Sequence, residues 1–139
     1  MRFMVIVKAN KDSEAGVLPT TEQFAEMGKF NEELVKAGIM LAGEGLQDTS
    51  KGARVKFNGK NREVSPGPFK LTGDTIAGYW VWNCSSLDEA IEWLKRAPFQ
   101  DGEVEIRQIF QAADFGDSFT PELQEQEKRL GKQMAEYAG

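Results

Sequence analysis

Two carboxylates and one arginine are the side chains best suited to chemistry in this chain, which contains no histidine. Imidazole is the commonest general base near neutral pH, so any proton transfer here needs another group. Glu44 lies between Gly43 and Gly45, which permit unusual backbone dihedral angles and close approach by another group, as suits a site loop. In an apolar cleft, loss of water would favour the protonated form of Glu44 and suit it to carrying a proton. The alternative is a turn in which Glu44 caps a neighbouring backbone amide.

Glu105 and Arg107 form the second candidate group. They are two residues apart in an expected strand that begins at Val104. Alternation along a strand puts both side chains on the face opposite Val104 and Ile106. Arg107 can hold a substrate carboxylate through two parallel hydrogen bonds, with Glu105 orienting it or acting as the base. The alternative is an ion pair within the strand or across an interface.

Aromatic side chains offer a surface for a ring-shaped ligand. In the expected strand 77–83, Trp80 and Trp82 share one face and Tyr79 lies on the other. Packing in a core or an interface is the alternative role for such aromatics. Phe69, on a proline-containing loop, is expected either to cover the pocket or to anchor a partner subunit.

Composition excludes several classes of protein. The chain has 139 residues, 40% of them hydrophobic, and a formal net charge of -5. This length favours one domain, and the negative charge argues against binding to nucleic acid, which needs a basic stripe. The apolar start, Met1 to Lys8, is too short to span a membrane, so no membrane association is expected and the cytoplasm is the default location.

Metal and cofactor binding are not expected either. The chain has a single cysteine, Cys84, so no internal disulfide forms. Cys84 precedes an expected helix N-terminus, which favours a reactive thiol; the alternative is a small, partly buried residue at a strand end. Acidic residues such as Asp74 lack calcium-loop spacing, and Gly43-Glu44-Gly45 lacks the remaining spacing of a phosphate loop.

The pattern of elements predicts an α+β domain. We expect a strand over residues 1–8, a helix over 20–37, a short extended run at 39–42, a hairpin over 53–65 turning at Asn58-Gly59, a strand over 77–83, a helix from Ser86 to before Pro98 and a strand from Val104. This order is β-α-β-β-α-β with an inserted hairpin, a ferredoxin-like arrangement. Both faces of the first strand are apolar, so a second layer, for which a partner subunit is the natural candidate, is expected on the sheet.

Residues 111–139 are expected to lie outside this domain of residues 1–110. They begin with a linker and continue as a helix from Thr120-Pro121. Its thin apolar stripe, which includes Leu123 and Leu130, suggests docking on another surface.

Several stretches of the chain resemble the YCII-related proteins, specifically the subgroup named for its Asp-Gly-Pro-Phe motif. They run from Met1 to about Phe110 and are Phe30-Asn31-Glu32-Glu33-Leu34, Ala37-Gly38-Ile39, Gly43-Glu44-Gly45-Leu46, Gly67-Pro68-Phe69, Gly78-Tyr79, Leu87-Asp88-Glu89-Ala90-Ile91-Glu92-Trp93 and Val104-Glu105-Ile106-Arg107.

The resemblance implies a homodimeric α/β-barrel in which two sheets face each other and enclose a cleft. Relatives in the wider group are similar to small lyases or dehydrochlorinases that act on ring compounds with a His-Asp pair, and many members of the subgroup are encoded beside alternative sigma factors. This chain has Pro66 and Leu71 where the motif usually has acids, while Asp74 falls where the next acid of the motif usually sits. Asp74 is therefore carried over as a ligand-binding candidate, and the His-Asp pair is not.

Three functional interpretations remain open at this level. The first is a dimeric module whose cleft binds a small anionic or aromatic metabolite, with Arg107, Tyr79, Trp80, Trp82, Phe69 and Asp74 as binding residues. The second is a small lyase or isomerase in which Glu44 or Glu105 is the general base. The third is a structural protein held together by its C-terminal helix.

Overall fold

The computed structural model describes residues 1–138, so Gly139, the last residue of the predicted C-terminal segment, lies outside the described residues. The chain divides into two compact units, Met1–Gln108 and Ile109–Gly139. The first unit contains β1 (Arg2–Lys8), α1 (Lys11–Glu14), α2 (Thr21–Lys36), β2 (Met40–Gly45), the 3-10 turn η1 (Thr49–Lys51), β3 (Ala53–Asn58), β4 (Asn61–Pro66), β5 (Ile76–Asn83), α3 (Leu87–Leu94) and β6 (Val104–Gln108).

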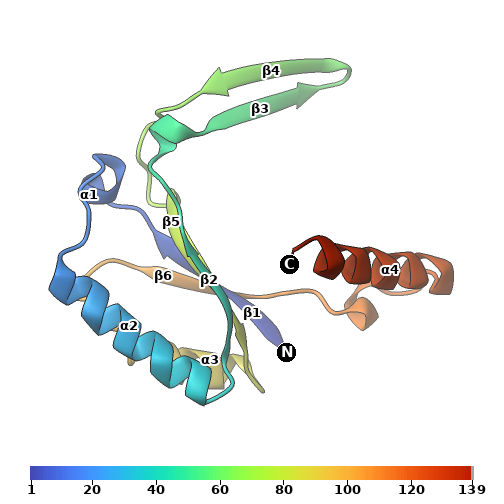
Figure 1. Cartoon of the computed structure of the whole chain (residues 1–139). Helices are drawn as coiled ribbons and strands as arrows, with labels where there is room; N and C mark the ends of the chain where they lie inside the picture. The colour runs from blue at the N-terminus through green and yellow to red at the C-terminus, as the bar shows by residue number, and fades with distance from the viewer. Residues whose placement is uncertain (139) are drawn as a thin grey trace. The chain divides into compact units, whose positions relative to one another are not determined.

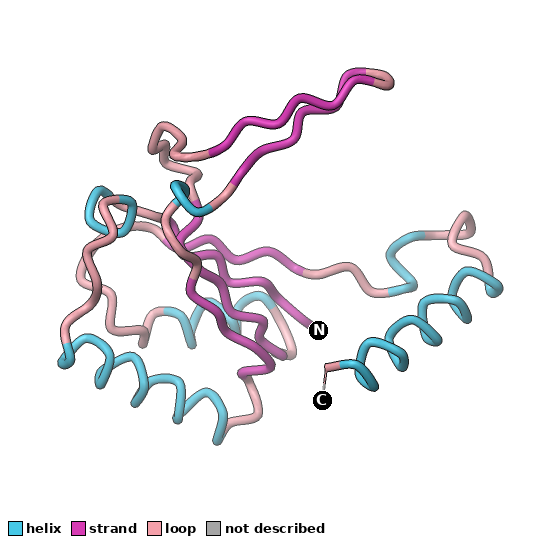
Figure 2. The backbone as a smooth tube through the Cα atoms, turned by 45° about the horizontal axis from the view of Figure 1, so that its top comes forward, coloured by secondary structure: helices cyan, strands magenta, loops and turns pink. Residues whose placement is uncertain are grey.

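The first unit is built on a four-stranded sheet in the order β2-β5-β1-β6, and every neighbouring pair is antiparallel. α2 connects β1 to β2 and α3 connects β5 to β6, and both helices cover the same face of the sheet (Figures 1 and 2). This is the split β-α-β arrangement of ferredoxin-like domains. The predicted α+β class, with an antiparallel sheet, an inserted hairpin and a C-terminal helix, is confirmed.

The hydrophobic core lies between this sheet and the two helices. Its buried members are Phe3, Val5, Phe30, Leu34, Ile39, Trp80, Trp82, Cys84 and Ala90. The ring of Phe30 from α2 packs edge-on against Trp80 and Trp82 of β5, with centroids 6.0 and 6.3 Å away. Each fully buried large side chain stabilises the fold by about 1.5–3 kcal/mol, so this face of the sheet holds the unit together.

The ends of α2 and α3 follow from local sequence. Thr20 and Gln23 form a reciprocal capping box at the start of α2. At the start of α3 the Ser86 hydroxyl accepts from the Glu89 N–H (3.1 Å), but the Glu89 carboxylate accepts instead from the Ser85 hydroxyl (2.6 Å). Residues 9–19, where no helix or strand was expected, contain the single-turn helix α1, which is too short to show helical periodicity.

The inserted hairpin forms its own two-stranded sheet, called the arm below, and projects from the four-stranded sheet (Figures 1 and 2). Its turn differs by one residue from the prediction, since Asn58 still pairs with Asn61 and the two turn residues are Gly59 and Lys60. Gly59 has a φ of +60°, which glycine adopts without strain. Every residue of β3 and β4 is exposed.

The second unit contains the 3-10 turn η2 (Ala112–Phe115) and α4 (Pro121–Tyr137). As predicted, Thr120 caps α4 and Pro121 occupies its first turn. Phe115 stacks on Phe110 at 4.5 Å and contacts Phe119 edge-on at 5.3 Å. No residue of α4 is buried. None of the described helices is long and apolar enough to cross a membrane.

Candidate functional site

The face of the sheet opposite the two helices, called the open face below, carries four of the predicted site residues. The strand register places Glu44, Tyr79, Ile6 and Glu105 in one row across β2, β5, β1 and β6, and Arg107 lies in the next row. Because neighbouring strands are about 4.8 Å apart, the row measures about 14 Å between its end strands. Glu44 and Glu105 therefore lie at opposite edges and contact different parts of any bound molecule.

Glu105 lies between two cations. The Lys8 Nζ atom is 3.0 Å from its Oε1 oxygen, and the Arg107 Nε atom is 3.9 Å from its Oε2 oxygen. Because each carboxylate oxygen already faces a cation, the geometry favours an orienting role for Glu105 over proton removal. The Arg107 side chain is 72% exposed, so most of its planar group of donors remains available to a ligand.

Lys8 joins Glu105 to the predicted ligand-binding residue Asp74. Its Nζ atom also lies 3.4 Å from the Asp74 Oδ1 oxygen, and its own side chain is only 11% exposed. The hydrogen bond to Glu105 raises the pKa of Lys8 above its ordinary value of 10.5, against the opposing effect of burial, and Asp74 raises it further. Lys8 is therefore a fixed positive charge at the edge of the open face.

Sequence reasoning did not single out Lys8. The sequence feature that could have identified Lys8 is the alternation of β1, in which Met4, Ile6 and Lys8 point away from the core while Phe3 and Val5 are buried. The partner that makes Lys8 significant, Glu105, is 97 positions away in the sequence. Only the pairing of β1 with β6 brings the two together.

The flanking glycines had suggested that Glu44 lies in a loop, but it does not. Gly43, Glu44 and Gly45 are part of β2, and none of them has a positive φ. Gly43 does allow close approach by another group, which was the second reason to expect glycine here. A Cβ atom at this position would lie 2.8 Å from the indole of Trp80. The Glu44 carboxylate has no hydrogen bond or ion pair among the described residues, and its side chain is on the open face.

The aromatic candidates divide between the two faces of β5. Tyr79 is half-buried on the open face, beside Ile6 and Glu44. Trp80 and Trp82 lie in the core, Trp82 with no exposed surface, and the Trp80 Nε1–H donates to the Asn31 side chain at 3.0 Å. The expectation that these two indoles line a ligand site is therefore wrong, because helix α2 already covers them.

Phe69 is held by its own chain. Its backbone N–H donates to the Thr49 hydroxyl (2.9 Å), and the Arg54 guanidinium lies 3.9 Å from the centre of its ring. Thr49 in turn donates through its N–H (3.0 Å) and its hydroxyl (2.7 Å) to the Glu14 carboxylate. These bonds tie the Gly67-Pro68-Phe69 turn to η1 and α1, and they do not join Phe69 to the row on the open face.

Cys84 is a core residue and not a reactive one. It is 3% exposed, and burial raises the pKa of its thiol. The unactivated alternative is therefore the one observed. Within residues 1–138, no group of three or more potential metal-ligating side chains comes together.

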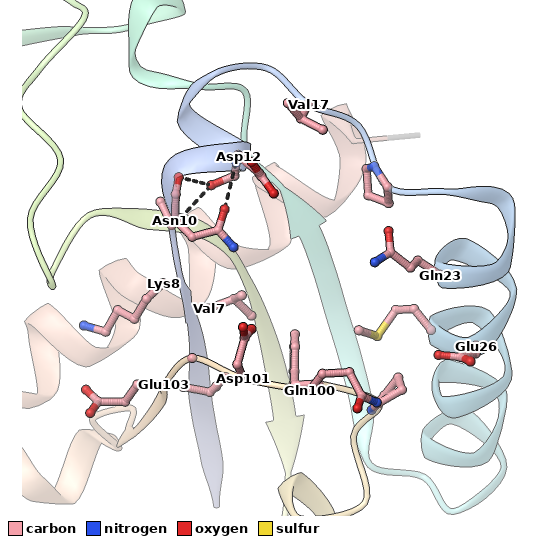
Figure 3. A pocket seen from close by; sticks show the side chains of 18 of the residues that line it. Val7, Lys8, Asn10, Asp12, Val17, Gln23, Glu26, Gln100, Asp101 and Glu103 are labelled. Carbon is pink, nitrogen blue, oxygen red and sulfur yellow. Dashed lines mark hydrogen bonds between the residues drawn. The ribbon is translucent and has the colours of Figure 1, made fainter.

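A concavity away from the open-face row, called the groove below, was not anticipated from the sequence (Figure 3). It has a volume of about 820 Å³ and lies between the stretch that runs from the end of β1 through α1 to the first turns of α2 and the α3–β6 loop. Its walls combine apolar residues such as Phe24 and Phe99 with the carboxylates of Asp12, Glu26 and Asp101. No single stretch of sequence marks it, because its walls come from two stretches far apart in the chain, residues 7–27 and 98–104, together with Gly73.

The family can be stated from comparison with known proteins. The model of the YCII-related domain matches residues 1–113. The chain belongs to the YCII-related family. None of the curated proteins compared with it is significantly similar in sequence.

Among solved structures, this YCII-related chain is similar to 5-chloro-2-hydroxyhydroquinone dehydrochlorinase from Burkholderia phenoliruptrix AC1100, in its complex with 2,5-dihydroxybenzoquinone. The sequence identity is 17%, the match covers 80% of this chain and 95% of the other, and the TM-score is 0.47.

Proposed function

We propose that this YCII-related protein binds a small anionic or aromatic metabolite on the open face of its sheet, in a cleft that a second copy closes. The observation that carries the proposal is the row of Glu44, Tyr79 and Glu105, with Arg107 in the adjoining row. It combines an aromatic ring, a guanidinium with free donors and two carboxylates on one continuous surface.

Apolar surface on the open face supports closure by a second copy. Met4, Ile6, Tyr79 and Val81 are only half-buried in the single chain, and no helix of residues 1–108 covers them. A sheet that is apolar on both faces is stable when each face packs against another layer. Two open faces packed together enclose the row and remove water from it, which strengthens every charged contact with a ligand.

Arg107 is the proposed anchor for an anionic group. Its Nε atom is 3.9 Å from Glu105, too long for a hydrogen bond, so Glu105 orients the side chain without consuming its donors. A ligand carboxylate accepts two parallel bonds from a guanidinium, and Tyr79 offers a ring face within reach along the same surface. Lys8 stays bound to Glu105 and Asp74 and holds that edge of the site in place.

The test begins with a screen of aromatic and aliphatic carboxylates by protein-observed NMR, followed by titration of the best compound. Arg107→Lys keeps the charge but removes the paired donors, and we expect about tenfold weaker binding. Arg129→Lys, the same change on exposed α4, is the matched control and should leave the affinity unchanged. Binding that Arg107→Lys does not weaken would contradict the proposal.

The alternative function is a small lyase or isomerase. It is favoured by one observation, the free carboxylate of Glu44 on the same row as Tyr79. Should a bound compound be turned over, Glu44→Gln is expected to abolish turnover and leave binding intact. Turnover that survives in both Glu44→Gln and Glu105→Gln would exclude a carboxylate base.

We also infer that the chain belongs to the Asp-Gly-Pro-Phe subgroup. Pro66 and Leu71 replace two motif acids, but the Gly67-Pro68-Phe69 turn is retained. Its glycine is required, since a Cβ atom on Gly67 would lie 1.6 Å from the Thr49 carbonyl oxygen. Retention of the turn without its acids supports a structural role for the motif in this member.

A further inference from the structure

The arm has an exposed apolar face on which no other described element of the first unit packs. The register pairs Val55 with Val64 and Phe57 with Arg62, so these four side chains share one face. Phe57 is 68% exposed and Val64 is 67% exposed. An isolated two-stranded hairpin is at best marginally stable in water, so the arm needs a surface to pack against.

The arm is also basic, whereas the chain as a whole is acidic. It carries four basic residues, Arg54, Lys56, Lys60 and Arg62, and one acid, Glu63, while the formal net charge of the chain is -5. The Arg62 guanidinium lies 4.7 Å from the centre of the Phe57 ring, so positive charge accompanies the apolar face. The surface that fits this face must therefore be apolar and negatively charged.

The groove has that character. The Asp12, Glu26 and Asp101 carboxylates have no hydrogen bond or ion pair among the described residues, and the exposed rings of Phe24 and Phe99 lie beside them. Lys8 is the one basic residue among the lining residues, and Figure 3 shows its side chain leaving β1 on the side opposite Val7. Its charge is engaged by Glu105 and Asp74. The groove thus presents uncompensated negative charge next to apolar surface.

We propose that the arm of one subunit docks in the groove of a second copy of this chain. Phe57 and Val64 would cover the rings of Phe24 and Phe99, and Lys60 and Arg62 would face the groove carboxylates. The arm of the same chain is not the occupant, since its tip points away from the segments that form the groove (Figures 1 and 2). At about 3.4 Å per residue, each six-residue strand extends about 20 Å, which is long enough to cross to a neighbour.

In a two-fold dimer this contact occurs twice, because each subunit supplies one arm and one groove. The inference adds to the proposed function and does not depend on ligand binding. The two contacts are independent: the open faces can pack against each other without the arm contact, and the arm can dock without packing of the open faces.

Photo-crosslinking tests the position of the arm directly. p-Benzoylphenylalanine in place of Phe57 is irradiated in the full-length protein mixed from ¹⁵N-labelled and unlabelled copies, and crosslinked peptides are identified by mass spectrometry. We expect mixed-isotope crosslinks to residues 17–27 or 98–103. Crosslinks confined to one chain, crosslinks to the open face or α4, crosslinks to co-purified nucleic acid, or the absence of any crosslink would overturn the proposal.

Charge reversal tests the electrostatic part. Lys60→Glu and Asp101→Lys should each weaken dimerisation about five- to tenfold, measured by sedimentation velocity, because each substitution alters two exposed contacts in a two-fold dimer. Combining the two substitutions should restore dimerisation, because residues 60 and 101 then carry opposite charges again. Lys132→Glu on α4 is the matched control and should have no effect. A double variant as weak as the single ones, or single variants that dimerise normally, would overturn the pairing. Arg107→Lys should leave the crosslink unchanged, which separates failure of this proposal from failure of the proposed function.

Discussion

At the scale of single residues, Lys8 organises the candidate site. It is nearly buried, it joins Glu105 to Asp74, and it leaves the Glu105 carboxylate less able to act as a base. Glu44, on the same row, differs from Glu105 because its carboxylate has no hydrogen bond or ion pair among the described residues. Two acids that looked equivalent in the sequence therefore have different capacities, and the difference comes from their neighbours.

The Lys8 ion pairs predict a dependence of stability on alkaline pH. The folded-state pKa of Lys8 is raised above 10.5, so its contribution to stability is fully present below that value and is lost as the pH rises through the folded pKa. Glu105→Gln removes the largest cause of the rise. We expect the urea midpoint of the wild type to exceed that of Glu105→Gln by a constant amount between about pH 8 and about pH 10, and the difference to shrink at higher pH. A difference that grows above pH 10.5 would contradict this assignment.

At the scale of elements, the Gly67-Pro68-Phe69 turn acts as a structural joint. Gly67 N–H donates to the Gly52 carbonyl at 2.9 Å, and Phe69 N–H donates to the Thr49 hydroxyl at 2.9 Å. Through Thr49 and Glu14, the turn connects the base of the arm to α1. The turn thus positions elements of the first unit relative to one another.

Gly67→Ala tests this joint. The added Cβ atom would lie 1.6 Å from the Thr49 carbonyl oxygen, so η1 and the turn must separate and their hydrogen bonds weaken. We expect a loss of about 2 kcal/mol in the free energy of unfolding. Gly73→Ala is the matched control, since nothing lies within 4 Å of its added Cβ atom, and it should change stability by less than about 0.5 kcal/mol. Equal stability of the two variants would remove the structural role assigned to Gly67.

At the scale of the whole molecule, the first unit has its own core and the second contributes no buried helix residue. The apolar stripe of α4 is exposed, which is compatible with the third interpretation, a structural protein held together by its C-terminal helix. Deleting residues 117–139 separates that interpretation from the sheet-faced dimer.

We expect the truncated protein to keep its thermal midpoint within about 3 °C and to keep the mass of the full-length oligomer less the deleted residues, measured by light scattering. The physical reason is that the core and the apolar open face both belong to residues 1–108. Conversion to a monomer on truncation would instead favour the tail as the source of assembly.

The strands and the helices α2, α3 and α4 were predicted in their order from the sequence, since capping residues, turn glycines and strand alternation act over a few positions. Alternation also placed Glu105 and Arg107 on the same face of their strand. In β5 it placed Trp80 and Trp82 on one face and Tyr79 on the other. It did not say which side faces the helices, and so the indoles were misassigned as ligand contacts. The tertiary structure was needed to show that the helices cover the Trp80 face, that Lys8 meets Glu105, and that residues 7–27 and 98–104 together form the groove. Those outcomes depend on pairings between residues tens of positions apart, which local pattern does not encode.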